Sequence, residues 1–265
     1  MSGGSTEPGR SVTSKVIAIL EAVSAGGGRL TLSQISRRAR LPIATVHRLT
    51  GELVGWGGLE RDAGGAYRIG TRLWEIGSLT PNRTGLRELA MPFMEDLYEV
   101  THENVQLAVL DGFDALVVEK ISGRRSVPTV TRVGGRLPLH ATGVGKALLA
   151  FSPPAQAEAF MARGLSPLTP CTIIDPDRLR ADLTEARRAG FAQTRDEMTM
   201  GAVSVACPVY AQAGTLAAAI SLVVRSQTAD VHRLAFAVHT ASLGLSRRLA
   251  EAWDGTSPAA RPSFH

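Results

Sequence analysis

One stretch of the chain carries positive charge with no carboxylate to balance it, because no Asp or Glu occurs between Ala22 and Gly51. Guanidinium groups pair well with phosphates, so an unbalanced group of arginines is suited to binding a polyanion. A single arginine on a polar face is ordinarily just solvated, and that alternative stays open for each one taken alone. The stretch contains five arginines, which are Arg29, Arg37, Arg38, Arg40 and Arg48.

The net positive charge lies mostly in the first third of the chain. The 265 residues carry a formal net charge of +5, and 44% of them are hydrophobic, enough to form two domains. The first 80 residues contain ten Lys and Arg against six Asp and Glu, whereas the rest of the chain is nearly neutral. We therefore expect a polyanion to bind the N-terminal part.

The elements around these arginines have the spacing of short amphipathic helices. Apolar residues from Thr13 recur at helical intervals up to three consecutive glycines, and Thr31 or Ser33 can cap a second helix. The pair Leu41-Pro42 predicts a turn, and a third helix is expected from Ile43 to Val54. Two short helices joined by a tight turn are typical of a helix-turn-helix that binds DNA.

The segment LERDAGGAYRIG, residues 59–70, follows the third predicted helix. Two short runs of alternating residues flank a Gly-rich turn, which predicts a β-hairpin. A hairpin directly after a helix-turn-helix is interpreted as a wing.

The rest of the chain predicts a linker and a mixed domain. Residues 71–101 look helical in two pieces, broken at Pro81-Asn82 and kinked or restarted at Pro92. From Asn104 the pattern changes to strands, with a hairpin signal at Asp111-Gly112. Strands mixed with helices in this way indicate an α+β domain on an antiparallel sheet. The expected strands are NVQLAVLDG, DALVVEKISG, SVPTVTRVG, SVACPVY and LAAAISLVV, and the expected helices cover 143–151, 155–163, 176–189 and 229–252.

The segment GVGK, residues 143–146, invites comparison with a nucleotide-binding phosphate loop. Such a loop needs Gly five residues before the Gly-Lys pair and Ser or Thr after it, where this chain has His140 and Ala147. The motif therefore fails. We interpret Lys146 as an exposed or ion-paired residue and His140 as a structural or pocket-edge imidazole.

No group of residues has the spacing of a catalytic or metal site. Asp196 and Glu197, with His140 and with Ser204 beside Cys207, match no nucleophile, zinc-protease or phosphate-loop motif. Cys171 and Cys207 stand apart from each other and from any histidine at ligand spacing. We therefore predict no catalytic residue, no metal and no cofactor.

The sequence also gives no sign of a membrane partner. No apolar run approaches the roughly 20 residues that span a bilayer, and the segment MSGGSTEPGRS lacks the order of a secretory signal. A cytoplasmic location is expected.

Several segments, in this order and spacing, resemble the IclR family of bacterial transcriptional regulators. They are SKVIAILEAV, LSQISRRARLPIATVHRLTGELV, YRIGTRLWEIG, LPLHATGVGKALLA, GFAQTRDEMTMGAVSVACPVY and AAAISLVV. The resemblance covers residues 11–252 and implies an α+β protein in which a linker helix joins an N-terminal winged helix-turn-helix to a C-terminal GAF-like effector-binding domain with an antiparallel sheet. The expected boundaries are a disordered tail at 1–10, the winged helix-turn-helix at 11–75, the linker helix at 76–101, the GAF-like domain at 102–253 and a disordered tail at 254–265.

The residue pattern and the resemblance agree on a DNA-binding surface. The third helix has a small outward face that can approach base edges, and we expect Thr45 and Arg48 to matter most. Arginines of the second helix suit phosphates, and those of the hairpin suit a minor groove. The predicted DNA-binding residues are Arg37, Arg38, Ala44, Thr45, His47, Arg48, Arg61 and Arg68.

The resemblance also implies a ligand pocket beside the helix that follows LPLHAT. Backbone N–H groups at that helix start can hold a carboxylate, and hydroxyl groups suit a small polar ligand. Some family members have an acid and a cysteine where this chain has Thr194 and Ser204, so the identity of the ligand stays open. The effector-binding residues carried over are Ser126, Thr129, Gly143, Val144, Thr194, Asp196, Ser204 and Ser221.

These observations predict a ligand-responsive regulator that binds a palindromic operator in double-stranded DNA, with repression favoured. Its effector is expected to be a small polar or acidic metabolite, with carboxylates among the candidates. The resemblance implies a homo-oligomer, either a dimer or a dimer of dimers. The alternatives are a constitutive DNA-binding protein with a vestigial ligand domain, and an enzyme acting on the pocket ligand.

Overall fold

The computed structural model describes residues 10–123, 127–128, 131–227 and 229–254. The chain forms two compact units, Met1–Thr84 and Gly85–His265. No helix of the described residues is both long enough and apolar enough to cross a membrane.

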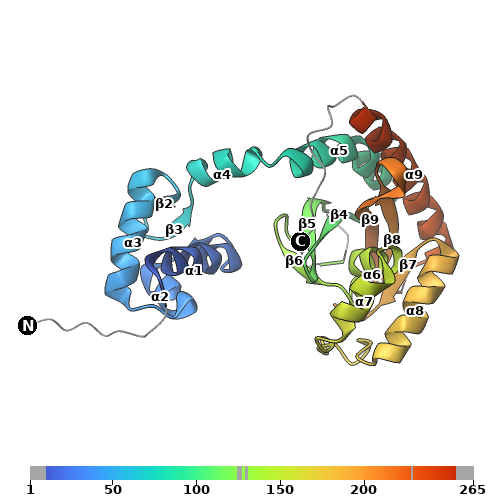
Figure 1. The fold of residues 1–265 in the computed structure, drawn as a ribbon, viewed down its shortest axis with the longest axis horizontal. Helices are drawn as coiled ribbons and strands as arrows, with labels where there is room; N and C mark the ends of the chain where they lie inside the picture. Colours follow the sequence, from blue (N-terminus) through green and yellow to red (C-terminus); the bar gives the residue numbers. More distant parts are fainter. Residues whose placement is uncertain (1–9, 124–126, 129–130, 228, 255–265) are drawn as a thin grey trace, which may run out of the picture. The chain divides into compact units, whose positions relative to one another are not determined.

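The N-terminal unit is built from helices and a small antiparallel sheet (Figure 1). Its sheet has the order β1-β3-β2, so the predicted wing hairpin pairs with a further short strand before the second helix. The elements are α1 (Val12–Ala25), β1 (Arg29–Leu30), α2 (Leu32–Ala39), α3 (Ile43–Trp56), β2 (Leu59–Arg61) and β3 (Tyr67–Ile69).

Local signals in the sequence explain where α2 and α3 begin and end. The Thr31 side chain accepts from the backbone N–H of Gln34, and the Gln34 side chain accepts from the N–H of Thr31, which is a capping box. Arg40 ends α2 in the left-handed conformation, with φ of 54°. The Ser36 hydroxyl then donates to the carbonyl of Leu41 over 2.7 Å, which holds the turn before α3.

Inward-facing side chains of α1, α2 and α3 form the core of this unit together with the hairpin. Their helical spacing leaves the opposite faces polar and exposed, which is how the arginines come to face solvent. The most deeply buried members are Ile19, Val23, Ile35, Val46, Leu49 and Leu59.

Two further helices follow, α4 (Thr71–Ser78) and α5 (Pro81–Thr101). Pro81 begins α5 rather than only interrupting a helix, and Pro92 lies inside α5 without ending it. The predicted two pieces are therefore present. The side chains of Leu86, Ala90, Met94 and Leu97 recur along α5 and are buried.

The C-terminal unit is a six-stranded antiparallel sheet with the order β6-β5-β4-β9-β8-β7. One face packs against α5 and α9, and the other packs against α6, α7 and α8 (Figure 1). The strands are β4 (Asn104–Asp111), β5 (Asp114–Ile121), β6 (Arg136–Pro138), β7 (Ala192–Arg195), β8 (Ala202–Tyr210) and β9 (Leu216–Arg225). The helices are α6 (Gly143–Phe151), α7 (Pro154–Met161), α8 (Pro176–Ala189) and α9 (Val231–Asp254).

The strand predicted for SVPTVTRVG, residues 126–134, is wrong in the part that the structure describes. Residues 127–128 and 131–134 form no strand, and β5 pairs with β6 on the side away from β4. Side chains hold this segment beside the sheet, since Asn104 donates to the carbonyl of Val127 over 2.8 Å and Lys120 donates to that of Thr131 over 2.9 Å. The alternation of Val and Thr in this segment suits an extended chain as well as a sheet strand.

Candidate functional site

The outward face of α3 is exposed and small near its start. Ala44, His47 and Arg48 are exposed and Thr45 is half-buried, while Val46 is fully buried on the opposite side. The predicted arginines of α2 and of the hairpin, Arg37, Arg38, Arg61 and Arg68, are also exposed. The N-terminal unit therefore presents every predicted DNA-binding residue at least partly to solvent.

Two of the predicted DNA-binding arginines are paired with carboxylates. Arg48 Nη1 lies 2.5 Å from Glu52 Oε1, and Arg68 Nη2 lies 2.7 Å from Glu60 Oε2. Hydrogen bonding to Arg68 lowers the pKa of Glu60. Exposed pairs of this kind contribute little to stability, so a phosphate or a base edge can displace the carboxylate. Arg37 and Arg38 have no ion pair within the described residues.

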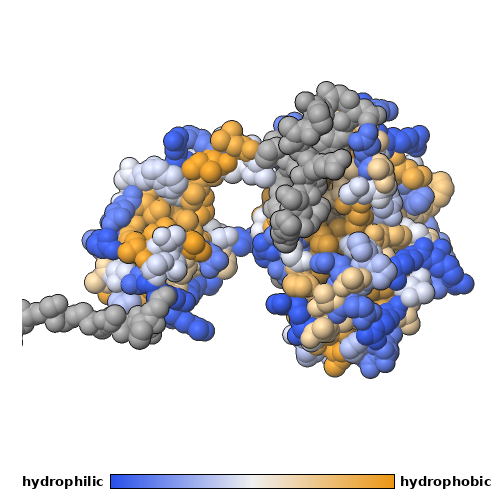
Figure 2. Space-filling view, viewed as in Figure 1, coloured by the Kyte–Doolittle hydropathy of each residue, from blue (hydrophilic) through white to orange (hydrophobic). Residues whose placement is uncertain are grey.

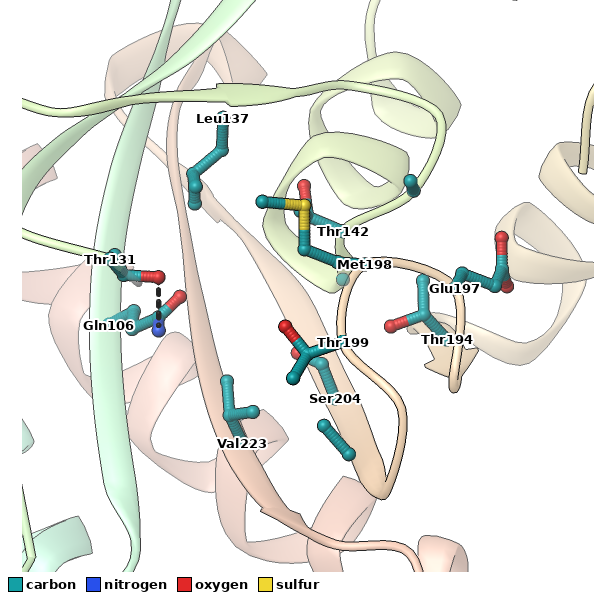
Figure 3. A pocket seen from close by; sticks show the side chains of 13 residues that line it. Gln106, Thr131, Leu137, Thr142, Thr194, Glu197, Met198, Thr199, Ser204 and Val223 are labelled. Atoms are coloured by element: carbon teal, nitrogen blue, oxygen red, sulfur yellow. Dashed lines mark hydrogen bonds between the residues drawn. The ribbon is translucent and has the colours of Figure 1, made fainter. Parts of the chain in front are cut away.

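A pocket lies in the C-terminal unit on the sheet face that packs against α6 (Figure 3). It is a small, open hollow, and about 460 Å³ of non-atom space lies within it, open solvent included. The lining residues are Gln106, Thr131, Leu137, Ala141, Thr142, Gly143, Thr194, Glu197, Met198, Thr199, Ala202, Ser204 and Val223.

The start of α6 forms one wall of this pocket. Thr142 caps the helix by accepting from the N–H of Gly145 over 3.2 Å, and its hydroxyl donates to the carbonyl of Pro138 over 2.8 Å. A Cβ at Gly143 would lie 2.4 Å from Ser204 Oγ, so only glycine lets the helix start approach β8 this closely. Gly143 and Ser204 thus meet at the same wall.

Hydroxyl and amide groups provide the polar chemistry of the pocket. Gln106 Nε2 donates to Thr131 Oγ1 over 3.2 Å, which fixes two lining side chains from different segments (Figure 3). Among the lining residues only Glu197 is charged, and Figure 3 shows its carboxylate pointing away from the labelled hydroxyls. The pocket can therefore form neutral hydrogen bonds to a ligand, with apolar contacts from Leu137, Met198 and Val223.

A buried ion group lies behind the pocket. Lys146 is only 1% exposed, and its Nζ lies 2.7 Å from Glu197 Oε1 and 2.8 Å from Asp182 Oδ2. Burial raises the pKa of Glu197, and the charge of Lys146 opposes that shift. The sequence predicted that Lys146 is either exposed or ion-paired. It is ion-paired and buried. Glu197, the partner of Lys146 in this group, is also buried.

The structure brings some of the predicted effector residues together and separates others. Gly143, Thr194 and Ser204 line the pocket. Ser126 and Thr129 lie outside the described residues, so their predicted roles stay untested.

Three predicted effector residues do not line the pocket. Val144 packs in the hydrophobic core, because the turn of α6 carries it away from the helix start that Gly143 presents. Asp196 Oδ1 accepts from the N–H of Gly201 over 2.6 Å and so closes its own loop. Ser221 is fully buried on β9, in register with Gln106, and its hydroxyl has no hydrogen-bond partner among the described residues.

Sequence reasoning missed several lining residues. Gln106 interrupts an otherwise apolar strand, and that break in the pattern was the available signal. Thr142 stands at the N-cap position before a glycine, a further readable signal. Thr131, Met198 and Thr199 lie on loops and carry no comparable pattern.

The described residues contain no group of three or more His, Cys, Asp or Glu that could hold a metal ion. Burial raises the pKa of Cys207 to about 12, and Cys207 packs in the core on the sheet face opposite the pocket. One chain thus carries a helix-turn-helix in its N-terminal unit and a pocket in its C-terminal unit. This combination is typical of DNA-binding regulators.

Comparison with known proteins identifies the family. Residues 12–63 match the IclR helix-turn-helix domain, and residues 80–247 match the bacterial transcriptional regulator IclR C-terminal domain. The chain belongs to the IclR family of bacterial transcriptional regulators.

Named relatives are regulators of transcription. The HTH-type transcriptional regulator KipR of Bacillus subtilis is 32% identical over 224 residues, which cover 83% of this chain and 90% of KipR. The HTH-type transcriptional repressor AllR of Escherichia coli is 32% identical over 227 residues, which cover 83% of each chain.

Solved structures agree with the fold. An IclR homolog from Microbacterium hydrocarbonoxydans, complexed with 4-hydroxybenzoate, superposes with a TM-score of 0.84 at 35% identity and covers 91% of this chain and 100% of that chain. The IclR protein of Thermotoga maritima superposes with a TM-score of 0.74 at 26% identity and covers 90% of this chain and 98% of that chain. This protein is therefore a DNA-binding transcriptional regulator with an α+β fold.

Proposed function

We propose that this regulator is a repressor that binds a palindromic operator as a homo-oligomer. A small carboxylate bound in the pocket changes its affinity for DNA. One observation carries the proposal. The same chain holds a helix-turn-helix with exposed arginines and a separate pocket lined by hydroxyl groups. A protein with only the first feature would bind DNA constitutively.

Repression and oligomerisation rest on two lines of support. AllR, a relative at 32% identity, is a repressor by name. In the single chain α4 buries none of its residues and leaves Trp74 and Leu79 exposed, which favours pairing with a second copy. A two-fold dimer matches a palindromic site, because each half-site then meets one recognition helix.

The carboxylate rests on the chemistry of the pocket wall and on the similar structure that holds 4-hydroxybenzoate. Gly143 lines the pocket as the first residue of α6, where backbone N–H groups favour an anion. The hydroxyls of Thr194 and Ser204 can complete the hydrogen bonds of a small acid. Because no cationic side chain lines the pocket within the described residues, we expect modest affinity for a simple carboxylate.

The decisive experiment measures DNA binding by gel shift, with a duplex obtained by in vitro selection from random sequence. We expect Arg48→Ala to weaken binding by about 1–3 kcal/mol if Arg48 contacts a base. Arg188→Ala is the matched control, since Arg188 is likewise exposed and paired with a carboxylate on its own helix. Equal binding by wild type and Arg48→Ala would remove Arg48 from the DNA site.

The same gel shift tests the effector. Adding 4-hydroxybenzoate, then a panel of small carboxylates, should change the affinity of wild type for DNA, and Ser204→Val should reduce that change. Thr184→Val, which alters an exposed hydroxyl on α8, is the control. No response to any member of the panel would favour the constitutive DNA-binding protein instead, and product formation would indicate an enzyme.

A further inference from the structure

The first two residues of α3 have no side chain that can form a hydrogen bond. Pro42 is the N-cap residue and makes no side-chain cap, and Ile43 and Ala44 follow it. The first side chains on the helix that can donate or accept belong to Thr45 and His47. In a helix-turn-helix the start of the second helix is the part that reaches base edges in the major groove.

Ile43 is 51% exposed at the start of α3, whereas the other exposed large apolar residues of this helix, Val54 and Trp56, lie near its end. Val46 and Leu49 are almost completely buried in the core of the unit, and Ile43 is not part of that core. A lone exposed isoleucine is unremarkable on most surfaces. Here it lies beside exposed Ala44 and on the same helix as Arg48, so its neighbours belong to the proposed DNA surface.

Among the base edges in the major groove, only thymine offers a methyl group. Amides and guanidinium groups read the other edges by hydrogen bonds, which Ile43 and Ala44 cannot form. If Ile43 and Ala44 enter the groove, these two side chains can therefore gain sequence information from thymine alone. Facing any other base, it would cover polar edge atoms without pairing them.

We propose that Ile43, supported by Ala44, is a specificity-determining residue that contacts the C5 methyl group of a thymine in each operator half-site. The inference rests on the proposed operator binding. Ile43 and Arg48 are five residues apart, so they are separated by about 7.5 Å along the helix axis. The two side chains also point about 140° apart around the helix, so the thymine is a different base from the one that Arg48 contacts in the same half-site.

The test replaces each thymine of the selected operator in turn by deoxyuridine, which removes only the methyl group. Wild type should lose about fourfold in affinity at one thymine per half-site, the value of one buried methyl group. Ile43→Ala should bind the thymine operator more weakly than wild type and should be insensitive to deoxyuridine at that same position. Because Ile43 is exposed, unfolding should not confuse the result, and the melting temperature checks this.

Val54→Ala is the matched control, because Val54 is an exposed apolar residue near the other end of α3. This variant should keep the wild-type sensitivity to deoxyuridine. The inference is overturned if wild type tolerates deoxyuridine at every position, if the selected half-site has no required thymine, or if Ile43→Ala stays as sensitive as wild type. Selection that enriches no DNA sequence would instead contradict the operator binding on which the inference rests.

Discussion

The residues of the GVGK segment resemble part of a phosphate-loop motif, but they have a packing role here. A Cβ at Gly143 would collide with Ser204 Oγ, and one at Gly145 would lie 2.5 Å from the Cα of Leu139. Both glycines therefore allow close packing of α6 against β8 and the preceding loop. Lys146 reaches a buried ion group rather than a phosphate. The GVGK residues therefore serve helix packing and an ion pair, which agrees with the mismatch to a phosphate loop in the sequence.

His140 provides a prediction at the same scale. It is buried, its Nε2 lies 2.9 Å from the carbonyl oxygen of Ser166, and its Nδ1 has no partner among the described residues. Burial lowers the pKa of His140, and the charge of Lys146 adds to that shift. As pH falls below the ordinary histidine pKa of about 6.5, His140 binds a proton in the unfolded chain but stays neutral in the folded chain. The free energy of unfolding therefore decreases as pH falls through this range.

The check is urea denaturation of wild type and His140→Gln at about pH 7.5 and about pH 5.5, on either side of the ordinary histidine pKa. Glutamine keeps a donor for Ser166 and does not titrate. The loss of stability between the two pH values should therefore be smaller in the variant. Equal losses would show that His140 does not control this pH dependence.

At the scale of elements, the loop at residues 196–201 depends on groups from two other segments, the loop at 169–172 and α6. The Thr169 hydroxyl donates to the carbonyl of Asp196 over 2.6 Å, and the Thr172 hydroxyl donates to that of Glu197 over 2.7 Å. Lys146 on α6 holds the carboxylate of Glu197. Because Met198 and Thr199 of this loop line the pocket, the ion group helps to position one pocket wall.

Replacing Lys146 alone should lower the free energy of unfolding more than replacing Lys146 and Glu197 together. Lys146→Met leaves Glu197 buried and unpaired and should lower the free energy of unfolding by about 3–5 kcal/mol. Adding Glu197→Gln removes the buried charge, and Asp182, whose side chain is 32% exposed, can be solvated. The double variant should therefore be more stable than Lys146→Met alone by urea denaturation. A double variant that is less stable would contradict this account.

The exposed pair of Arg180 and Glu158 offers a control for that experiment, because it also joins two helices of the same unit. Arg180→Met should cost less than about 1 kcal/mol, since solvent screens both partners. A comparable loss at the two sites would mean that burial is not what makes the Lys146 group costly to break.

At the scale of the whole molecule, the single chain leaves an apolar surface without a partner. Trp74 is 70% exposed and Leu79 is 77% exposed, at α4 and its C-cap, where Figure 2 shows an apolar area. We expect wild type to form at least a dimer, and the double variant Trp74→Glu, Leu79→Glu to shift toward monomer because charge would be buried in the interface. Light scattering after size-exclusion chromatography measures the mass.

Ile174→Ser is the control for the oligomer experiment, because Ile174 is an exposed apolar residue of the loop before α8. It should leave the mass unchanged. A wild type that is monomeric at micromolar concentration would contradict both this prediction and the proposed two-fold binding to DNA.

The sequence by itself determined the elements that depend on local interactions. Helical spacing, the Thr31 capping signal, the Leu41-Pro42 turn and the Asp111-Gly112 hairpin each involve residues close together in the chain, and all are present in the structure. The two-residue β1 and the four-residue β7 were missed, since strands this short carry little pattern and form through pairing with distant partners.

Only the tertiary structure decided which side chains face the pocket. The lining residues come from β4, β6, α6, β7, β8, β9 and several loops, so their meeting depends on sheet order and register. A shift of one residue along a strand turns a side chain to the opposite face, and one helical position separates Gly143 at the pocket from Val144 in the core. Local spacing in the sequence therefore predicted which side chains of α3 face solvent, whereas long-range packing decided which side chains line the pocket.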